Sequence, residues 1–519
     1  MSIMPGKILG ELKKNDLSFY CMLAVLVFSL SGGFAFSVTI QTLVFLIITF
    51  SFCFLFINRS FPDKKIFLVF LPVAVVVLSY FGADFQVNIR NASLGLINAV
   101  AAFFIMAYSD GRNKENITIT IIILGLWVSF MVFMRFLSGN ANIEMAVSLN
   151  INIIAGFLLL IFPLVFCFEG KKNYALFLFF GLIIFSAIIL TKSRAAILIS
   201  YLISFYFFIT LNKSRFSKIF FFTVSAIVIC GLIYAFSAKA GWGSFSDRIM
   251  WWKTAWLMFK DHPFLGIGFG NYGAFFTYYR PELVINTLFA HNIIFQLLAE
   301  TGIAGLLSFC TLFFIIFKKA FSNNGLLPVN KSAIKAALLG FIAFNFTDYS
   351  FFIPLNMIIF FTLCGILYSG EPVKRKTAKI CFLVFVPALY AALVFIYPLI
   401  AENYYEKGSL YFRQKEYTEA ERNYLLAVKY DKKNPVLWYE MSESWLARIK
   451  SGDEPRGEFL EKAIENALRA EFFYGHSGQI KVALAYLYKL KGDEENSAKY
   501  LNAAIQTDRF NPFYKQYTE

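Results

Sequence analysis

Long apolar segments recur through the first 400 residues, and they decide most of what this chain can fold into. As α-helices, segments of about 20 residues match the roughly 30 Å hydrocarbon core of a bilayer. About thirteen of them are present: 19–36, 38–57, 66–82, 92–108, 117–137, 147–168, 174–190, 194–211, 217–236, 292–317, 333–349, 352–369 and 378–400. Because lipid offers the backbone no hydrogen-bond partners, apolar segments of this length span as helices. The sequence therefore predicts an all-α, polytopic membrane protein.

Composition and charge agree with this class. Of 519 residues 58% are hydrophobic, and 64 are Phe, whereas soluble domains are about 45–50% apolar. The formal net charge of +15 does not indicate nucleic acid, because the Lys and Arg residues gather in loops between the apolar segments. The seven Cys residues include no CxxC pair. Neither a disulfide framework nor a zinc site is therefore indicated.

The basic residues also predict an orientation. They gather in every second loop: Arg59, Lys64, Lys65, Arg112, Lys114, Lys171, Lys172, Lys213, Arg215, Lys218, Lys318, Lys319, Lys331, Lys335, Lys374, Arg375, Lys376 and Lys379. Loops rich in Lys and Arg stay in the cytoplasm. We therefore expect a cytoplasmic N-terminus that leads into an uncleaved first span, and an outer face that holds the 237–291 loop, Asp348 and everything after Tyr397. Chemistry on that face has no ATP or nucleotide sugar to draw on.

After residue 400 the sequence becomes charged and rich in Tyr and Ala. The positions that follow tetratricopeptide spacing are Gly408, Tyr411, Tyr417, Ala420, Tyr424, Ala427 and Pro435, and a related unit recurs near the end. We expect residues 1–400 to form a membrane domain and 401–519 a helical domain of about three hairpins, the middle one irregular. A generic helical bundle is the alternative. In either case the domain is predicted to bind protein partners and not to perform catalysis.

The span at 292–317 begins with an unusual polar stripe. Asn292, Gln296 and Glu300 are four residues apart, so on a helix they lie along one face, with His291 at its entry. A stripe of this kind must face protein or water. It is either part of a functional site or a hydrogen-bonded seam that holds helices together.

The loop before this stripe has two further features. Trp252, Trp256 and Phe259 share one face of a predicted helix, which is typical of a helix lying among lipid headgroups. The glycines of GIGFG, residues 266–270, are predicted to form a tight turn. A dinucleotide-binding loop is rejected because no strand precedes them and the GxGxxG spacing is not completed.

Three arginines belong to the outer surface: Arg194, Arg248 and Arg280. A guanidinium group is permanently charged and planar, and it suits phosphate oxygens better than the ammonium group of Lys does. Each arginine alone could simply reach toward lipid headgroups. Three beside the His-led stripe favour a diphosphate-binding site.

His291 is the candidate catalytic residue. An unperturbed imidazole titrates near pH 6.5, so His291 could accept a proton from an attacking hydroxyl at neutral pH. A helix-capping role is the alternative. No His or Cys lies beside it at ligand spacing, so no metal is expected. Glu300 and Asp348 are candidate supporting carboxylates, as Asn292 and Gln296 are supporting amides.

The motifs TKSRAAIL, DRIMWWKTAWLMFKDHPFLGIGFGNY and HNIIFQLLAETGIAGLL resemble the O-antigen ligase and polymerase family of bacterial envelope proteins, over roughly residues 190–310. The resemblance implies a GT-C-like fold in the inner membrane. It also implies transfer of a glycan from an undecaprenyl-diphosphate carrier on the outer face, without nucleotide sugar or redox cofactor and, for the ligases, without metal. His291 then matches the motif His, and Arg194 and Arg248 match the motif arginines. Arg280 is a weaker match.

The mechanism implied is inverting. The arginines would hold the diphosphate leaving group while His291 activates an acceptor hydroxyl. The acceptor stays open among lipid A core, a growing polysaccharide and protein, because the repeat domain is more like the polymerase and protein-glycosylating branches. A transporter of lipid-linked or anionic solutes and a membrane scaffold are the alternatives. No inverted repeat supports the first, and the second leaves His291 and its arginines unexplained.

Overall fold

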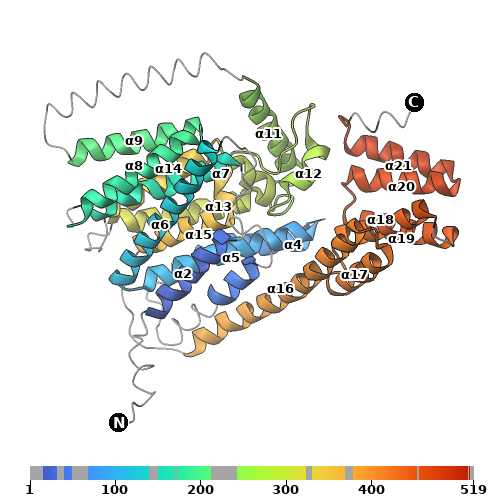
Figure 1. Ribbon diagram of the computed structural model, residues 1–519, viewed down its shortest axis with the longest axis horizontal. Helices are drawn as coiled ribbons and strands as arrows, with labels where there is room; N and C mark the ends of the chain where they lie inside the picture. Colours follow the sequence, from blue (N-terminus) through green and yellow to red (C-terminus); the bar gives the residue numbers. More distant parts are fainter. Residues whose placement is uncertain are drawn as a thin grey trace, which may run out of the picture.

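The computed structural model describes residues 16–31, 40–48, 68–83, 85–138, 150–169, 172–211, 242–322, 330–368, 378–452, 455–511 and 514. All regular structure within these residues is helical, as predicted. The chain forms a bundle of apolar helices and, at one end of the bundle, a stack of helical hairpins (Figure 1). The predicted span at 217–236 lies outside the described residues, and so do most of 38–57 and the N-terminal basic segment.

The bundle consists of α2 (Asp16–Ser31), α4 (Leu71–Gly82), α5 (Gln86–Tyr108), α6 (Gly111–Leu137), α7 (Ile151–Ile161), η2 (Phe162–Phe168), α8 (Tyr174–Leu190), α9 (Arg194–Leu211), α13 (Ile293–Ser322), α14 (Lys331–Phe344) and α15 (Pro354–Tyr368), with η3 (Ser350–Phe352) before α15. Among the residues that the structure describes, four helical stretches are long and apolar enough to cross a membrane: Gln86–Tyr108, Gly111–Leu137, Ile151–Phe168 and Ile293–Lys319. Shorter apolar helices occupy Leu68–Gly82, Tyr174–Leu190, Arg194–Thr210 and Pro354–Tyr368, each at a predicted span. The multi-pass class is confirmed. The number thirteen stays a prediction.

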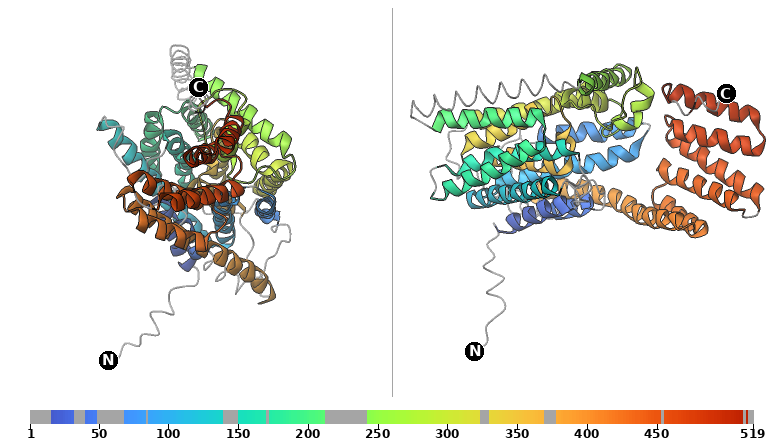
Figure 2. Two further views of the ribbon diagram at one scale, coloured as in Figure 1. Left: turned by 90° about the vertical axis from the view of Figure 1, so that its right-hand side faces the viewer. Right: turned by 45° about the horizontal axis from the view of Figure 1, so that its top comes forward.

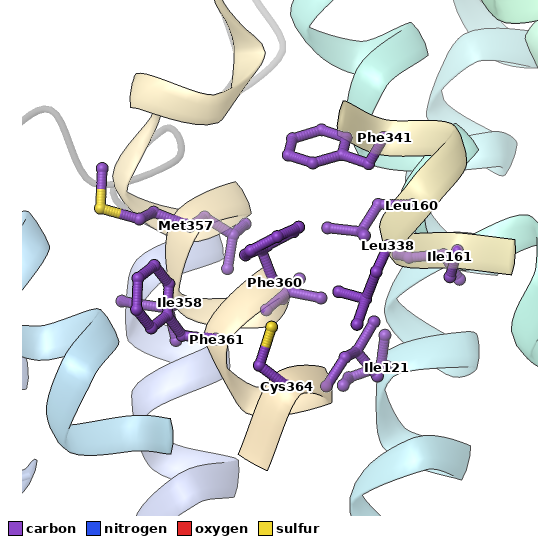
Figure 3. Packing of buried hydrophobic residues seen from close by; sticks show 14 of the residues in the cluster. Ile121, Leu160, Ile161, Leu338, Phe341, Met357, Ile358, Phe360, Phe361 and Cys364 are labelled. Carbon is purple, nitrogen blue, oxygen red and sulfur yellow. The ribbon is translucent and has the colours of Figure 1, made fainter. Parts of the chain in front are cut away.

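Helix α15 forms the centre of the bundle. Every one of its residues is buried, which is expected of a helix that is apolar on all sides. Phe360 of α15 lies against Leu338 and Phe341 of α14 and Leu160 of α7 (Figure 3). A Cβ added at Gly365 would approach the Phe103 carbonyl oxygen to 2.3 Å, so only Gly allows α5 and α15 to pack this closely. The loop that carries Asp348 leads directly into this rigid helix.

Helix α13 is interrupted, although the sequence predicted a continuous span. Gly302 has a φ of +61° within it. The N–H groups of Ile303 and Ala304 donate to the carbonyls of Pro263 and Phe264 at 2.9 and 3.2 Å. The loop after α11 (Trp242–Asp261) therefore inserts its backbone at the break, and a neighbouring segment completes the hydrogen bonds that the helix gives up.

The GIGFG segment forms the predicted tight turn. Its three glycines have φ values of +68°, +101° and +86°, a region that side-chain-bearing residues rarely adopt. The N–H groups of Ile267 and Gly268 donate to the carbonyls of Ala299 and Glu300 at 2.9 and 3.0 Å. The turn thus fixes the loop against α13 and leads into α12 (Tyr272–Tyr279).

Within the described residues, the C-terminal domain consists of three helical hairpins, the number predicted. They are α16 (Ala378–Arg413) with α17 (Tyr417–Tyr430), α18 (Pro435–Ser451) with α19 (Arg456–Phe473), and α20 (Gly478–Lys491) with α21 (Glu494–Thr507). Figure 2 shows them stacked at the end of the bundle that also holds α11 and α12. Helix α16 runs unbroken through the predicted domain boundary between residues 400 and 401, so the last predicted span and the first repeat helix form one continuous helix.

Candidate active site

His291 lies at the entry of α13 in the left-handed backbone region, with a φ of +53°. A residue with a side chain adopts this region rarely, and such residues concentrate at functional sites. Asn292 stabilises the turn, because its Oδ1 accepts from the N–H of Ile294 at 2.9 Å and its Nδ2 donates to the Phe346 carbonyl at 2.8 Å. The N–H of Ile293 donates to the Asn345 carbonyl at 2.8 Å. These bonds fix the backbone at the start of α13, directly after His291.

Two aromatic rings enclose the His291 imidazole. The indole of Trp251 on α11 stacks on it, with ring centres 4.5 Å apart and planes at 28°. The Tyr349 ring meets it edge-on, also at 4.5 Å. His291 is 8% exposed, and its Nδ1 atom is buried without a hydrogen-bond partner. The ring is therefore fixed by packing and keeps a nitrogen without a protein partner.

Trp251 and Tyr349 were missed by the sequence analysis. Trp252, Trp256 and Phe259 were expected on a helix face among lipid headgroups. In the structure Trp252 stacks on Phe295, and Trp256 is 43% exposed. The signal for Trp251 was its position three residues after Arg248, which puts both on one helix face. Nothing in the sequence indicated that Tyr349 would meet His291.

The polar stripe of α13 binds loop backbone. Oε1 of Gln296 accepts from the N–H of Ala290 at 2.5 Å, and Oε1 of Glu300 accepts from the N–H of Tyr272 at 3.0 Å. Gln296 and Glu300 are both buried. Together with the Asn292 cap, these bonds fit the seam alternative, with the loop before α13 as the partner. Asn292, Gln296 and Glu300 therefore position the loop around His291.

Arg194, Arg248 and Asp348 form one electrostatic cluster with His291. Burial lowers the pKa of Arg248, the Asp348 carboxylate opposes that shift, and Arg194 adds to it. Asp348 is buried, which raises its pKa, although its Oδ1 accepts from the N–H and Oγ of Ser350 at 2.9 and 2.5 Å and Arg248 is near. Arg248 interacts with both the Arg194 guanidinium and the Asp348 carboxylate, and two guanidinium groups close to each other would be stabilised by an anion bound beside them.

The imidazole of His291 is uncharged at neutral pH. Burial lowers its pKa to about 3, and the positive charge of Arg248 contributes to the same shift. A neutral imidazole can accept a proton, but a base with so low a pKa is weak. Neutralising Arg248 with a bound anion would raise the pKa and strengthen the base. Within the described part of the chain, no three His, Cys, Asp or Glu side chains gather in a way that could hold a metal ion.

We expect His291 to stay unprotonated when the pH falls through 6, where an ordinary imidazole takes up a proton. Substituting Arg248→Gln removes one of the two causes of the low His291 pKa, the positive charge of Arg248, and should move the His291 titration to higher pH. Nuclear magnetic resonance of the histidine-labelled protein measures this, because the chain has only 3 His and His291→Gln assigns the signal. Lys253→Gln, which removes an exposed positive charge from the same helix, is the matched control. A midpoint between pH 6 and 7 in the parent would contradict the expectation.

Arg280 has a different environment from the one predicted. Its Nη2 pairs with Oδ1 of Asp508 at 2.5 Å, and both side chains are buried. Its Nη1 donates to Oδ1 of Asn286 at 3.0 Å and to the Val284 carbonyl at 3.3 Å. Because these groups already engage the guanidinium, we leave Arg280 out of the diphosphate-binding set.

Fold and site together define a helical, multi-pass membrane protein with a buried histidine and a positively charged cluster beside a helical repeat domain. Residues 178–310 match the family model of the O-antigen ligase domain, and residues 401–434 and 478–511 match the tetratricopeptide repeat. No curated protein matches this chain. The chain thus carries an O-antigen ligase domain followed by tetratricopeptide repeats. These domains support a glycosyltransferase-like role in the membrane on lipid-linked glycan and acceptor substrates, with protein interactions through the repeats.

Proposed function

We propose that this protein transfers a glycan from undecaprenyl diphosphate to an acceptor hydroxyl. The observation that carries the proposal is that the neutral imidazole of His291, whose Nδ1 has no hydrogen-bond partner, belongs to one cluster with two arginines and one carboxylate. A positive cluster of this kind suits a diphosphate, and the imidazole beside it suits a hydroxyl that must lose its proton. The ligase domain contains His291, Arg194 and Arg248.

In the proposed reaction, the acceptor oxygen attacks the anomeric carbon of the donor glycan. The new carbon–oxygen bond forms as the bond to the diphosphate breaks, and the electron pair leaves with the undecaprenyl diphosphate. Arg194 and Arg248 stabilise the charge that develops on the leaving oxygen. His291 takes the hydroxyl proton. Attack opposite the leaving group inverts the configuration at the anomeric carbon, and cleavage of the glycosyl–diphosphate bond drives transfer.

Binding of the donor would also prepare the base. Burial lowers the pKa of His291, and the positive charge of Arg248 lowers it further. The diphosphate would neutralise that charge, so the imidazole would become a stronger base only when the leaving group is in place.

We place the reaction on the outer face of the bacterial cytoplasmic membrane. The support is the distribution of Lys and Arg, which predicts a cytoplasmic N-terminus and an outer 237–291 loop. The repeat domain lies at the same end of the bundle as that loop (Figure 2), so it would also be outside. Donor and acceptor then meet where no nucleotide sugar is available.

The test uses membrane vesicles of known orientation that carry an undecaprenyl-diphosphate-linked glycan. Right-side-out vesicles should transfer the glycan to an added acceptor without detergent, and inverted vesicles should need detergent. Lipid A core, polysaccharide and protein acceptors are supplied in separate reactions, so the reaction that yields product identifies the acceptor. Transfer only from inverted vesicles would overturn the location, and absence of transfer to all three acceptors by correctly folded protein would overturn the function.

A further inference from the structure

The three hairpins of the repeat domain present equivalent residues to the membrane domain. Asp431, Tyr474 and Asp508 each follow the last residue of the second helix of a hairpin. In all three, the backbone N–H donates to the carbonyl of an Ala four residues earlier, Ala427, Ala470 or Ala504. The repeat therefore places one side chain per hairpin along the same edge of the stack.

Each of these three side chains contacts the membrane domain. Oδ2 of Asp431 pairs with Nη2 of Arg90 on α5 at 2.8 Å. The Tyr474 hydroxyl donates to the Ala274 carbonyl on α12, and its ring stacks on Phe85 with centres 4.6 Å apart. Asp508 pairs with Arg280 in the loop after α12. One whole edge of the repeat domain is thus engaged within the chain.

The contacts of Tyr474 and Asp508 lead to the candidate site. Tyr474 holds α12, and Asp508 holds the segment that follows α12. In α12, the Tyr272 hydroxyl donates to the Trp251 carbonyl at 2.8 Å and its N–H donates to Glu300. The Trp251 indole Nε1 donates to the Ile285 carbonyl at 3.0 Å. The ring that stacks on His291 is therefore attached to the segments that the repeat domain holds.

We propose that the repeat domain is a clamp on the candidate site, with Asp508 and Arg280 as positioning residues that keep Trp251 against His291. The proposal rests on the proposed function for its effect on catalysis, and on the contacts alone for its effect on His291. Arg280 then acts through Asp508 and does not touch the donor. Protein partners of the repeats would have to use a surface other than this edge.

A double-mutant cycle tests the clamp. Replacing one member of a buried ion pair leaves the other charge buried without its partner, whereas replacing both by apolar side chains does not. Arg280→Met and Asp508→Leu should each lower kcat by roughly tenfold to a hundredfold, because a displaced catalytic group loses about 10²-fold. The KM for the donor should change little. The double variant should recover most of the loss, which a donor-binding arginine would not allow.

A second measurement does not depend on transfer. Ring stacking on Trp251 shifts the resonances of the His291 ring in the full-length protein, so each single variant should move them and the double variant should restore them. Arg469→Ala breaks an exposed ion pair with Glu465 in α19 and should change neither kcat nor the His291 resonances.

The outcomes distinguish a failure of the clamp proposal from a failure of the proposed function. If Arg280→Met abolishes transfer while Asp508→Leu changes neither transfer nor the His291 resonances, Arg280 acts on the substrate and the clamp is wrong. If neither single variant moves those resonances, the repeat domain does not hold the site. If each single variant moves the His291 resonances and the double variant restores them, but the parent transfers no glycan, the clamp stands and the proposed function fails.

Discussion

Substituting His291→Ala is expected to lower glycan transfer by about 10²–10⁴-fold, the contribution of a positioned general base, while the protein still inserts and folds. The ring contacts of His291 with Trp251 and Tyr349 contribute about 0.5–1.5 kcal/mol each beyond area burial. This loss is small beside the packing of the bundle around α15. Transfer from an undecaprenyl-diphosphate glycan by the purified protein measures the effect, and thermal unfolding reports the fold.

His262→Ala is the matched control, because His262 is exposed after the end of α11 and has no role in the proposal. It should retain parental activity. A His291→Ala variant that transfers glycan within a few-fold of the parent would remove His291 from the mechanism, and the base would then have to be sought among the remaining polar groups of the cluster, beginning with Asp348.

Substituting Arg194→Lys or Arg248→Lys is expected to lower transfer by roughly tenfold to a hundredfold, although each keeps its charge. A guanidinium group offers a planar fork that bonds two phosphate oxygens at once, and an ammonium group does not. Because the leaving oxygen gains charge in the transition state, kcat should fall as well as donor affinity. Rates at varied donor concentration separate the two effects.

Arg135→Lys, in the last turn of α6, is the matched control and should behave like the parent. If Arg194→Lys and Arg248→Lys both transfer glycan at the parental rate with normal expression, the two arginines hold lipid headgroups or protein groups, and the diphosphate-binding site must be sought elsewhere.

The sequence predicted a large part of the fold because the features concerned are local. Spans such as Gly111–Leu137 and Ile293–Lys319 follow from runs of apolar residues, and the hairpins follow from small residues at a fixed spacing. The tight turn of the GIGFG segment follows from glycine itself. Arg194, Arg248 and His291 were candidates in the sequence because their residue types and their places in the chain point to phosphate binding and proton transfer.

The tertiary structure decided what those residues touch. Arg280 pairs with a residue 228 positions away, so an arginine that resembles a phosphate ligand in the sequence is engaged by a carboxylate of the repeat domain. Trp251 meets His291 across 40 positions, and the break in α13 is completed by a loop from before α12. Periodicity reports which face of a helix is apolar, but not which distant segment covers it. The set of contacts that makes His291 neutral and fixed therefore depends on packing between elements, which no local pattern encodes.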